Sequence, residues 1–227
     1  MTATTLAAAA AERAQHIRQR ADRPSQRRSA EQPGARAAVR ATLSGVQVRE
    51  SGDAGATLEF RGHASVYEQA YEMWDMFGPY TEIVSEGAGS DSLARANLDV
   101  PLVLGHDQLR RLARTTTGTL FLTEDANGLF VHAPALDPAD HDVAYIAPKL
   151  KAGLIDEMSF AFRIEAGQWS PDYTEYRINR YDIHRGDVAI VGYGANPYTA
   201  GASVRQPAAA PAATRARALL ELGIAGV

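Results

Sequence analysis

The chain has 227 residues, 45% of them hydrophobic, and a formal net charge of −4, values that fit a soluble globular protein with one sizeable core. It contains no cysteine, which excludes a disulfide framework, a thiol nucleophile and a cysteine-ligated metal, and which fits a reducing cytoplasm. No run of about 18 apolar residues occurs, so we expect no membrane span, and the alanine-rich start lacks the charged first residues of a secretory signal.

Charge is unevenly distributed along the chain. The first 40 residues hold eight arginines and three acidic residues, a net charge of +5, which leaves −9 for the rest. Alanine and arginine favour a helix from Thr5 to Ala21, but this segment has too few large apolar side chains to form a core. We therefore interpret residues 1–41 as a flexible basic arm. Its positive charge either serves to bind an acidic partner or reflects a general use of arginine in place of lysine along the chain.

The body of the chain, residues 42–200, consists mostly of predicted strands. Seven segments either alternate apolar and polar residues or form short apolar runs next to turn residues, as strands do. These segments are 57–67, 100–104, 118–124, 129–133, 158–164, 173–178 and 187–191. The turn from Asp125 to Gly128 joins two of them into the clearest predicted hairpin.

One internal helix is predicted in the body. Apolar residues recur at helical spacing from residue 140 to residue 152, and Gly153 supplies a C-terminal stop. A single helix among many short strands favours a mainly β, α+β fold that is barrel-like with added helices. Residues 201–227 follow as an alanine- and proline-rich tail with a short apolar end.

Two residues are the best candidates for chemistry. His106 follows a short apolar run and Gly105 at a predicted strand end, and Ser159 lies between Met158 and Phe160 in a later strand. A histidine accepts a proton near neutral pH, and a serine becomes a nucleophile when such a base lies beside it. A serine hydrolase is one interpretation. A packing histidine and a polar strand serine are the other, and both stay open on these residues alone.

Other catalytic and binding motifs are weak or missing in the sequence. It contains no Gly-x-Ser-x-Gly elbow of the α/β-hydrolases, no His-Glu-x-x-His metal motif and no Walker-type phosphate loop. The glycine cluster at 192–194 follows a predicted strand, but no convincing helix comes after it. We therefore expect no metal site, no cofactor and no nucleotide.

Five segments, taken in order, resemble those of one family. They are 60–67 (FRGHASVY), 103–107 (VLGHD), 118–129 with the Asp-Ala-Asn-Gly turn, 151–162 (KAGLIDEMSFAF) and 186–197 (GDVAIVGYGANP). Together, over residues 58–200, they resemble the prohead, or capsid maturation, serine proteases of tailed bacteriophages. Each motif is weak alone, but five in this order and at this spacing are fairly specific.

The resemblance implies a fold related to the herpesvirus assembly protease, a closed β-barrel flanked by helices. It also implies that residues 42–200 are a protease domain that acts inside the assembling procapsid in the host cytoplasm. There it cleaves the scaffold protein or the major capsid protein, and then itself. These procapsid proteins are the expected partners, with no specific nucleic acid and no membrane. Whether the protein also forms a homo-oligomer stays open.

The same resemblance suggests which residues act. The family's histidine corresponds to His106, its serine to Ser159, and the acidic residue at the start of its final strand to Asp187. Ala189 replaces a common serine in that last segment. The herpesvirus relatives use a second histidine as the third member, and His184 lies nearby, so His184 is the alternative to Asp187. A catalytically inactive homologue that acts as a scaffold or assembly module also stays open.

Overall fold

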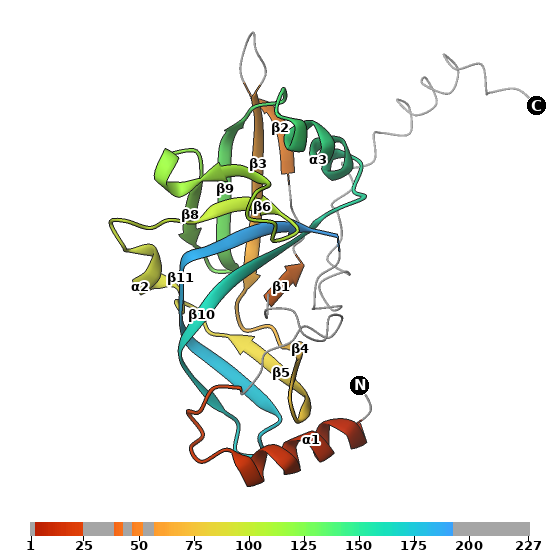
Figure 1. Cartoon of the computed structure of the whole chain (residues 1–227), viewed down its shortest axis with the longest axis vertical. Helices are drawn as coiled ribbons and strands as arrows, with labels where there is room; N and C mark the ends of the chain where they lie inside the picture. Colours follow the sequence, from red (N-terminus) through yellow and green to blue (C-terminus); the bar gives the residue numbers. More distant parts are fainter. Residues whose placement is uncertain (1–2, 25–38, 43–46, 52–56, 193–227) are drawn as a thin grey trace, which may run out of the picture.

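The structure is a computed structural model, and it describes residues 3–24, 39–42, 47–51 and 57–192 (Figure 1). Within these residues, strands dominate and a few helices lie around them, so the fold is mainly β with added helices, as the sequence predicts. The helices are α1 (Ala3–His16), α2 (Ser90–Leu93) and α3 (His141–Lys151), and a 3-10 turn covers Thr115–Thr117. The predicted tail, residues 201–227, lies outside the described residues.

The described strands form two sheets that share one apolar core. The larger sheet contains β1 (Val39–Thr42), β4 (Tyr71–Asp75), β5 (Gly78–Val84), β6 (Pro101–Leu104), β7 (Arg111–Arg114), β10 (Glu157–Trp169) and β11 (Glu175–Val191). The smaller sheet contains β2 (Gln47–Ser51), β3 (Thr57–Val66), β8 (Phe121–Glu124) and β9 (Gly128–Leu136). Fully buried side chains from both sheets meet in the core, among them Phe60 and Leu129 from the smaller sheet and Phe160 and Ile178 from the larger.

Strand β11 lies at the centre of the larger sheet and pairs with β10, β5 and β6. The main strand order is β1-β10-β11-β5-β4. The long antiparallel pair of β10 and β11 runs through much of the molecule (Figure 1). The first part of β11 pairs in parallel with β5, and its last part pairs in parallel with β6. Because one strand takes different neighbours at its two ends, the sheet branches and is mixed. The described strands form no closed barrel, so the barrel expected from the resemblance is wrong.

Strand β11 is also longer than expected. The sequence predicts separate strands at 173–178 and 187–191, whereas the structure has one strand of 17 residues. The polar residues between the two predicted strands find partners within the fold. Asp182 is buried, and it accepts hydrogen bonds from the Ser92 hydroxyl at 2.8 Å and from the Arg163 guanidinium. Polar residues that looked like a loop therefore continue the strand.

Two local predictions are confirmed. Strands β8 and β9 form the predicted hairpin, and Asp125 closes its turn by accepting hydrogen bonds from the backbone N–H groups of Asn127 (2.8 Å) and Gly128 (3.0 Å). Helix α3 begins after Asp140, whose carboxylate caps the first free backbone N–H groups of the helix. It ends shortly before Gly153, which has a φ of +65°, a left-handed conformation typical of a residue that follows a helix.

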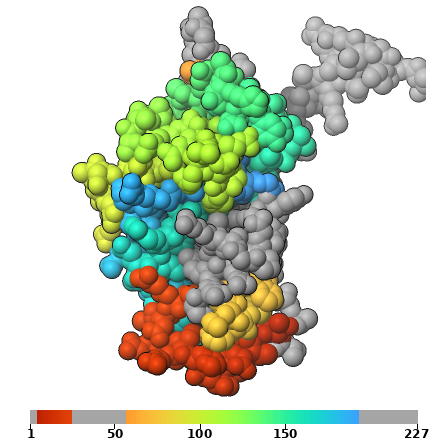
Figure 2. Space-filling view, in the orientation of Figure 1, coloured from red at the N-terminus to blue at the C-terminus, as the bar shows by residue number. Residues whose placement is uncertain are grey.

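The N-terminal helix α1 packs against the body of the protein. Residues 3–24 lie along one end of the molecule beside the segment of β4 and β5 (Figure 2). Residues 3–24 therefore differ from the flexible arm expected for residues 1–41. The central part of the expected arm, residues 25–38, lies outside the described residues.

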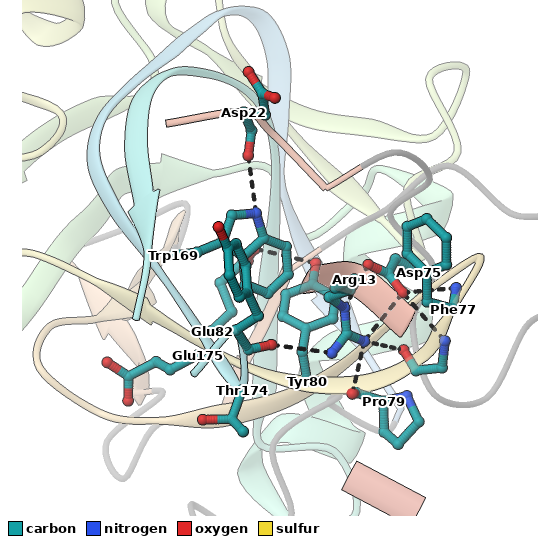
Figure 3. A network of polar contacts seen from close by, with 12 residues as sticks. Arg13, Asp22, Asp75, Phe77, Pro79, Tyr80, Glu82, Trp169, Thr174 and Glu175 are labelled. Atoms are coloured by element: carbon teal, nitrogen blue, oxygen red, sulfur yellow. Dashed lines mark hydrogen bonds and ion pairs between the residues drawn. The ribbon is translucent and has the colours of Figure 1, made fainter. Parts of the chain in front are cut away.

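A buried arginine explains the docking of α1 (Figure 3). The Arg13 guanidinium donates hydrogen bonds to both carboxylate oxygens of Asp75, at 2.7 and 3.0 Å, and to the backbone carbonyls of Gly78 (2.6 Å) and Pro79 (2.7 Å). It also lies 5.2 Å from the centre of the Trp169 ring, within cation–π range. A helix poor in large apolar residues is therefore anchored by a cation whose donors are matched to acceptors of the body. The Arg20 guanidinium, just beyond the helix, adds hydrogen bonds to the Trp169 carbonyl.

Candidate active site

Three neighbouring strands place the candidate residues on one face of the larger sheet. Ser159 on β10 pairs with Ala189 on β11, and Ala189 pairs with Val103 on β6. Because side chains alternate across a strand, Ser159, Asp187 and Ala189 share a face, while the adjacent Met158 joins the main apolar core. The nucleophile candidate therefore stands on the side of the sheet that is turned away from the main core.

His106 lies in a tight turn directly after β6. Gly105 and His106 have φ angles of +59° and +63°, and a residue other than glycine adopts this left-handed region only at an energetic cost. The N–H of Gly105 donates to the carbonyl of Ile190 on β11 at 2.9 Å, and the N–H of Asp107 donates to the carbonyl of Leu104 at 3.0 Å. The turn is thus tied to the same strand that carries Asp187.

The structure brings His106, Ser159 and Asp187 together in one line of hydrogen bonds. The Nε2 atom of His106 lies 2.9 Å from the Ser159 hydroxyl oxygen, and its Nδ1 atom lies 2.6 Å from Oδ1 of Asp187. Ser159 is 0% exposed and Asp187 is 3% exposed, whereas the His106 side chain is 22% exposed. The imidazole therefore reaches solvent between two buried partners.

The partners fix the protonation pattern of the neutral imidazole. A carboxylate only accepts hydrogen bonds, so Nδ1 of His106 carries the proton and donates a hydrogen bond to Asp187. Nε2 then has a free lone pair and accepts the hydrogen bond that the Ser159 hydroxyl donates. This arrangement can remove the hydroxyl proton when the serine oxygen attacks a carbonyl carbon. Ser159 is not open to solvent in this conformation.

Gly186 allows Asp187 to approach the site. A Cβ atom at Gly186 would lie 1.8 Å from the carbonyl oxygen of Ala161 on β10, far inside van der Waals contact. Arg185, the residue before it, has a φ of +60°. The backbone is therefore constrained at both positions that precede the carboxylate, and a side chain at Gly186 would push β10 and β11 apart beside Ser159.

The alternative third member, His184, is engaged elsewhere. Its Nδ1 atom accepts a hydrogen bond from the backbone N–H of Asp99 at 3.2 Å. No hydrogen bond or ion pair joins it to His106 within the described part of the chain. The geometry therefore favours Asp187 over His184 as the partner of the imidazole.

One residue of the site was missed by the sequence reasoning. The side-chain amide of Gln108 donates a hydrogen bond from Nε2 to Oδ2 of Asp187 at 2.6 Å, so both carboxylate oxygens have a partner. Its position two residues after His106 in the same turn is the only signal in the sequence. A glutamine carries no charge and belongs to no recognisable motif there, so the pattern did not single it out.

A cavity of about 190 Å³ borders this turn, and its wall includes Gln108, Arg111 and Arg185. Asp99 and Arg114 also line it. The Arg114 guanidinium, with hydrogen bonds of 2.7 Å to each oxygen of Asp99, holds the pKa of that carboxyl below its usual range. Three arginines against one aspartate make this wall positively charged.

Neither a metal centre nor a membrane helix is found in the part of the chain that the structure describes. No group of three or more histidine, aspartate or glutamate side chains is arranged there to hold a metal ion. None of the described helices has the length and apolar character needed to cross a bilayer.

Comparison with known proteins identifies one family. The sequence model of the caudovirus prohead serine proteases matches residues 44–211, a span that contains His106, Ser159 and Asp187. No curated protein matches the chain.

Among solved structures, the chain is similar to the capsid assembly protease gp21 of bacteriophage T4. The sequence identity is 11%, and the alignment covers 67% of this chain and 95% of that one. The TM-score of 0.39 is too low for the likeness to support an argument about fold or site.

Proposed function

The chain belongs to the caudovirus prohead serine proteases, and on that premise we propose that Ser159, His106 and Asp187 are its catalytic triad. The observation that carries the proposal is the continuous line of two hydrogen bonds, 2.9 Å from serine to imidazole and 2.6 Å from imidazole to carboxylate. Ser159 is the nucleophile, His106 the general base and Asp187 the group that orients the imidazole.

The proposed mechanism follows from this geometry. The Ser159 oxygen attacks the scissile carbonyl carbon while its proton moves to Nε2 of His106. The buried Asp187 carboxylate stabilises the imidazolium that forms, and it holds Nδ1–H so that Nε2 faces the serine. The imidazolium then gives its proton to the leaving amine as the C–N bond breaks. A water molecule, activated by the same imidazole, releases the acyl group and restores the serine.

We propose the procapsid as the place of action. A prohead protease acts on proteins that are assembled with it, so the scaffold protein and the major capsid protein are the proposed substrates, inside the assembling head in the host cell. Self-cleavage is the third proposed event. Family membership supports the setting, and the triad geometry supports the chemistry.

Co-expression tests the proposal. Ser159→Ala removes one oxygen from a side chain that lies beside Ala189, so the fold should persist while cleavage of co-expressed capsid and scaffold proteins stops. The matched control is Ser85→Ala, a half-buried serine whose hydroxyl bonds Asn179; this variant should cleave normally. The products are read by gel and mass spectrometry, which also give the cleavage sites.

Labelling of the same two proteins, the wild type and Ser159→Ala, distinguishes an active enzyme from an inactive assembly module. A fluorophosphonate probe should label the wild type at Ser159 and leave Ser159→Ala unlabelled. Normal processing by folded Ser159→Ala would rule out this serine as the nucleophile. A wild type that neither cleaves nor takes up the probe, but still enters procapsids, would favour the assembly role.

A further inference from the structure

Gln108 completes the surroundings of the Asp187 carboxylate. Oδ1 of Asp187 accepts from His106, and Oδ2 accepts from the Gln108 amide, each at 2.6 Å. The carboxylate is almost fully buried, and a buried charge is costly unless its oxygens are hydrogen-bonded. We infer that Gln108 is a positioning residue of the triad; this inference rests on the proposed function.

The orientation of the Gln108 amide is determined by its two neighbours. Asp187 only accepts hydrogen bonds, and the Arg111 guanidinium only donates them. Arg111 donates from Nη2 to the amide oxygen of Gln108 at 3.4 Å and from Nε to its backbone carbonyl at 2.7 Å. The amide nitrogen must therefore face Asp187. Arg111 holds the amide in place from the side of the cavity.

A single turn supplies both donors to the carboxylate. His106 and Gln108 are two residues apart, and both reach Asp187 from the loop between β6 and β7. Both carboxylate oxygens of Asp187 are therefore hydrogen-bonded, and the carboxylate cannot rotate about its Cβ–Cγ bond without losing one of these hydrogen bonds. Rotation would also release Nδ1–H of His106, so Gln108 acts on the imidazole through Asp187.

The absence of charge on the Gln108 amide matters as much as its hydrogen bond to Asp187. A cationic donor at this position would stabilise the carboxylate as an ion pair and compete with the imidazolium for its charge. The amide satisfies Oδ2 and leaves the full negative charge available to His106. A carboxylate in place of the amide has the opposite effect, because a second negative charge favours the protonated imidazole.

Two substitutions test the inference. Gln108→Ala should lower kcat about tenfold with little change in KM, the size expected when a charged group loses one hydrogen bond. Gln108→Glu should raise the pKa of the His106 imidazole, and the acidic limb of the kcat/KM profile should move to higher pH with it. Gln69→Glu, at an exposed position directly after a turn, adds the same charge away from the site and is the matched control for Gln108→Glu.

The imidazole titration is measured directly by NMR, following the ring Cε1–H signal of His106 with pH. It needs no turnover, so it reports how strongly residue 108 is coupled to His106 even if the wild type proves to be inactive, a result that would overturn the proposed function alone. Gln108 is exposed on a surface turn, and circular dichroism confirms that the variants are folded. A His106 titration in Gln108→Glu that superimposes on those of the wild type and Gln69→Glu would overturn the inference.

Discussion

The guanidinium of Arg13 binds both carboxylate oxygens of Asp75, at 2.7 and 3.0 Å, in a site where both side chains are fully buried. The two residues are 62 positions apart, and they join the N-terminal helix to the hairpin of β4 and β5. Asp75 also accepts hydrogen bonds from the backbone N–H groups of Phe77 and Gly78 in the hairpin turn. The ion pair therefore joins a helix and a hairpin that lie far apart in the sequence.

Removing the cation should destabilise the protein strongly. Arg13→Ala leaves the Asp75 carboxylate buried without its counter-ion, and breaking a buried ion pair in this way costs about 3–5 kcal/mol. The free energy of unfolding, measured by urea denaturation, should fall by that amount. Arg18→Ala is the matched control, since Arg18 is exposed two residues beyond the end of α1 and its loss should change stability by less than about 0.5 kcal/mol. Equal stability of the two variants would contradict the anchoring role.

Local structure was predictable from the sequence because its causes are local. The hairpin at Asp125 depends on one side chain that accepts from N–H groups two and three residues later, and α3 depends on its spacing and its Asp140 cap. The docking of α1 depends on Arg13 meeting an acceptor far along the chain, and composition alone made that segment look detached. The barrel was wrong for a similar reason, because the pairing of β11 with both β5 and β6 is set by long-range contacts.

In the candidate site, too, local features were predictable from the sequence and long-range contacts were not. His106 and Ser159 were each ambiguous alone, and the ordered motifs around them suggested the pair, while their 2.9 Å separation came only from the fold. The choice between Asp187 and His184 also needed the structure, because the sequence places both near the start of the last predicted strand. Gln108 was missed because nothing in its residue type distinguishes an amide that meets a carboxylate from one that meets water.

The third member of the proposed triad can be tested by comparing two substitutions. Asp187→Asn keeps the size of the side chain but replaces a carboxylate by an amide, which no longer stabilises the imidazolium and can favour the wrong tautomer of His106. By analogy with other triads, kcat should fall roughly 10⁴-fold. His184→Ala should retain near wild-type kcat, because His184 bonds the backbone of Asp99 and not His106.

Single-turnover cleavage of a capsid-derived peptide measures both variants, with thermal unfolding as a check that each is folded. A large loss of activity in His184→Ala together with an active Asp187→Asn would reverse the assignment. The herpesvirus-type histidine pair would then be the better description of this site.

Gly186 offers a test of how the backbone positions the carboxylate. Gly186→Ala forces a methyl group to within 1.8 Å of the Ala161 carbonyl oxygen unless β10 and β11 separate, and overpacking of this kind costs about 1–3 kcal/mol of stability. The separation falls between Asp187 and the strand of Ser159, so the activity of the folded variant should fall as well. Gly192→Ala is the matched control, because a Cβ at Gly192 meets no atom within 4 Å. If Gly186→Ala matches Gly192→Ala in both urea midpoint and peptide cleavage, the close approach of the strands is not what holds Asp187 in place.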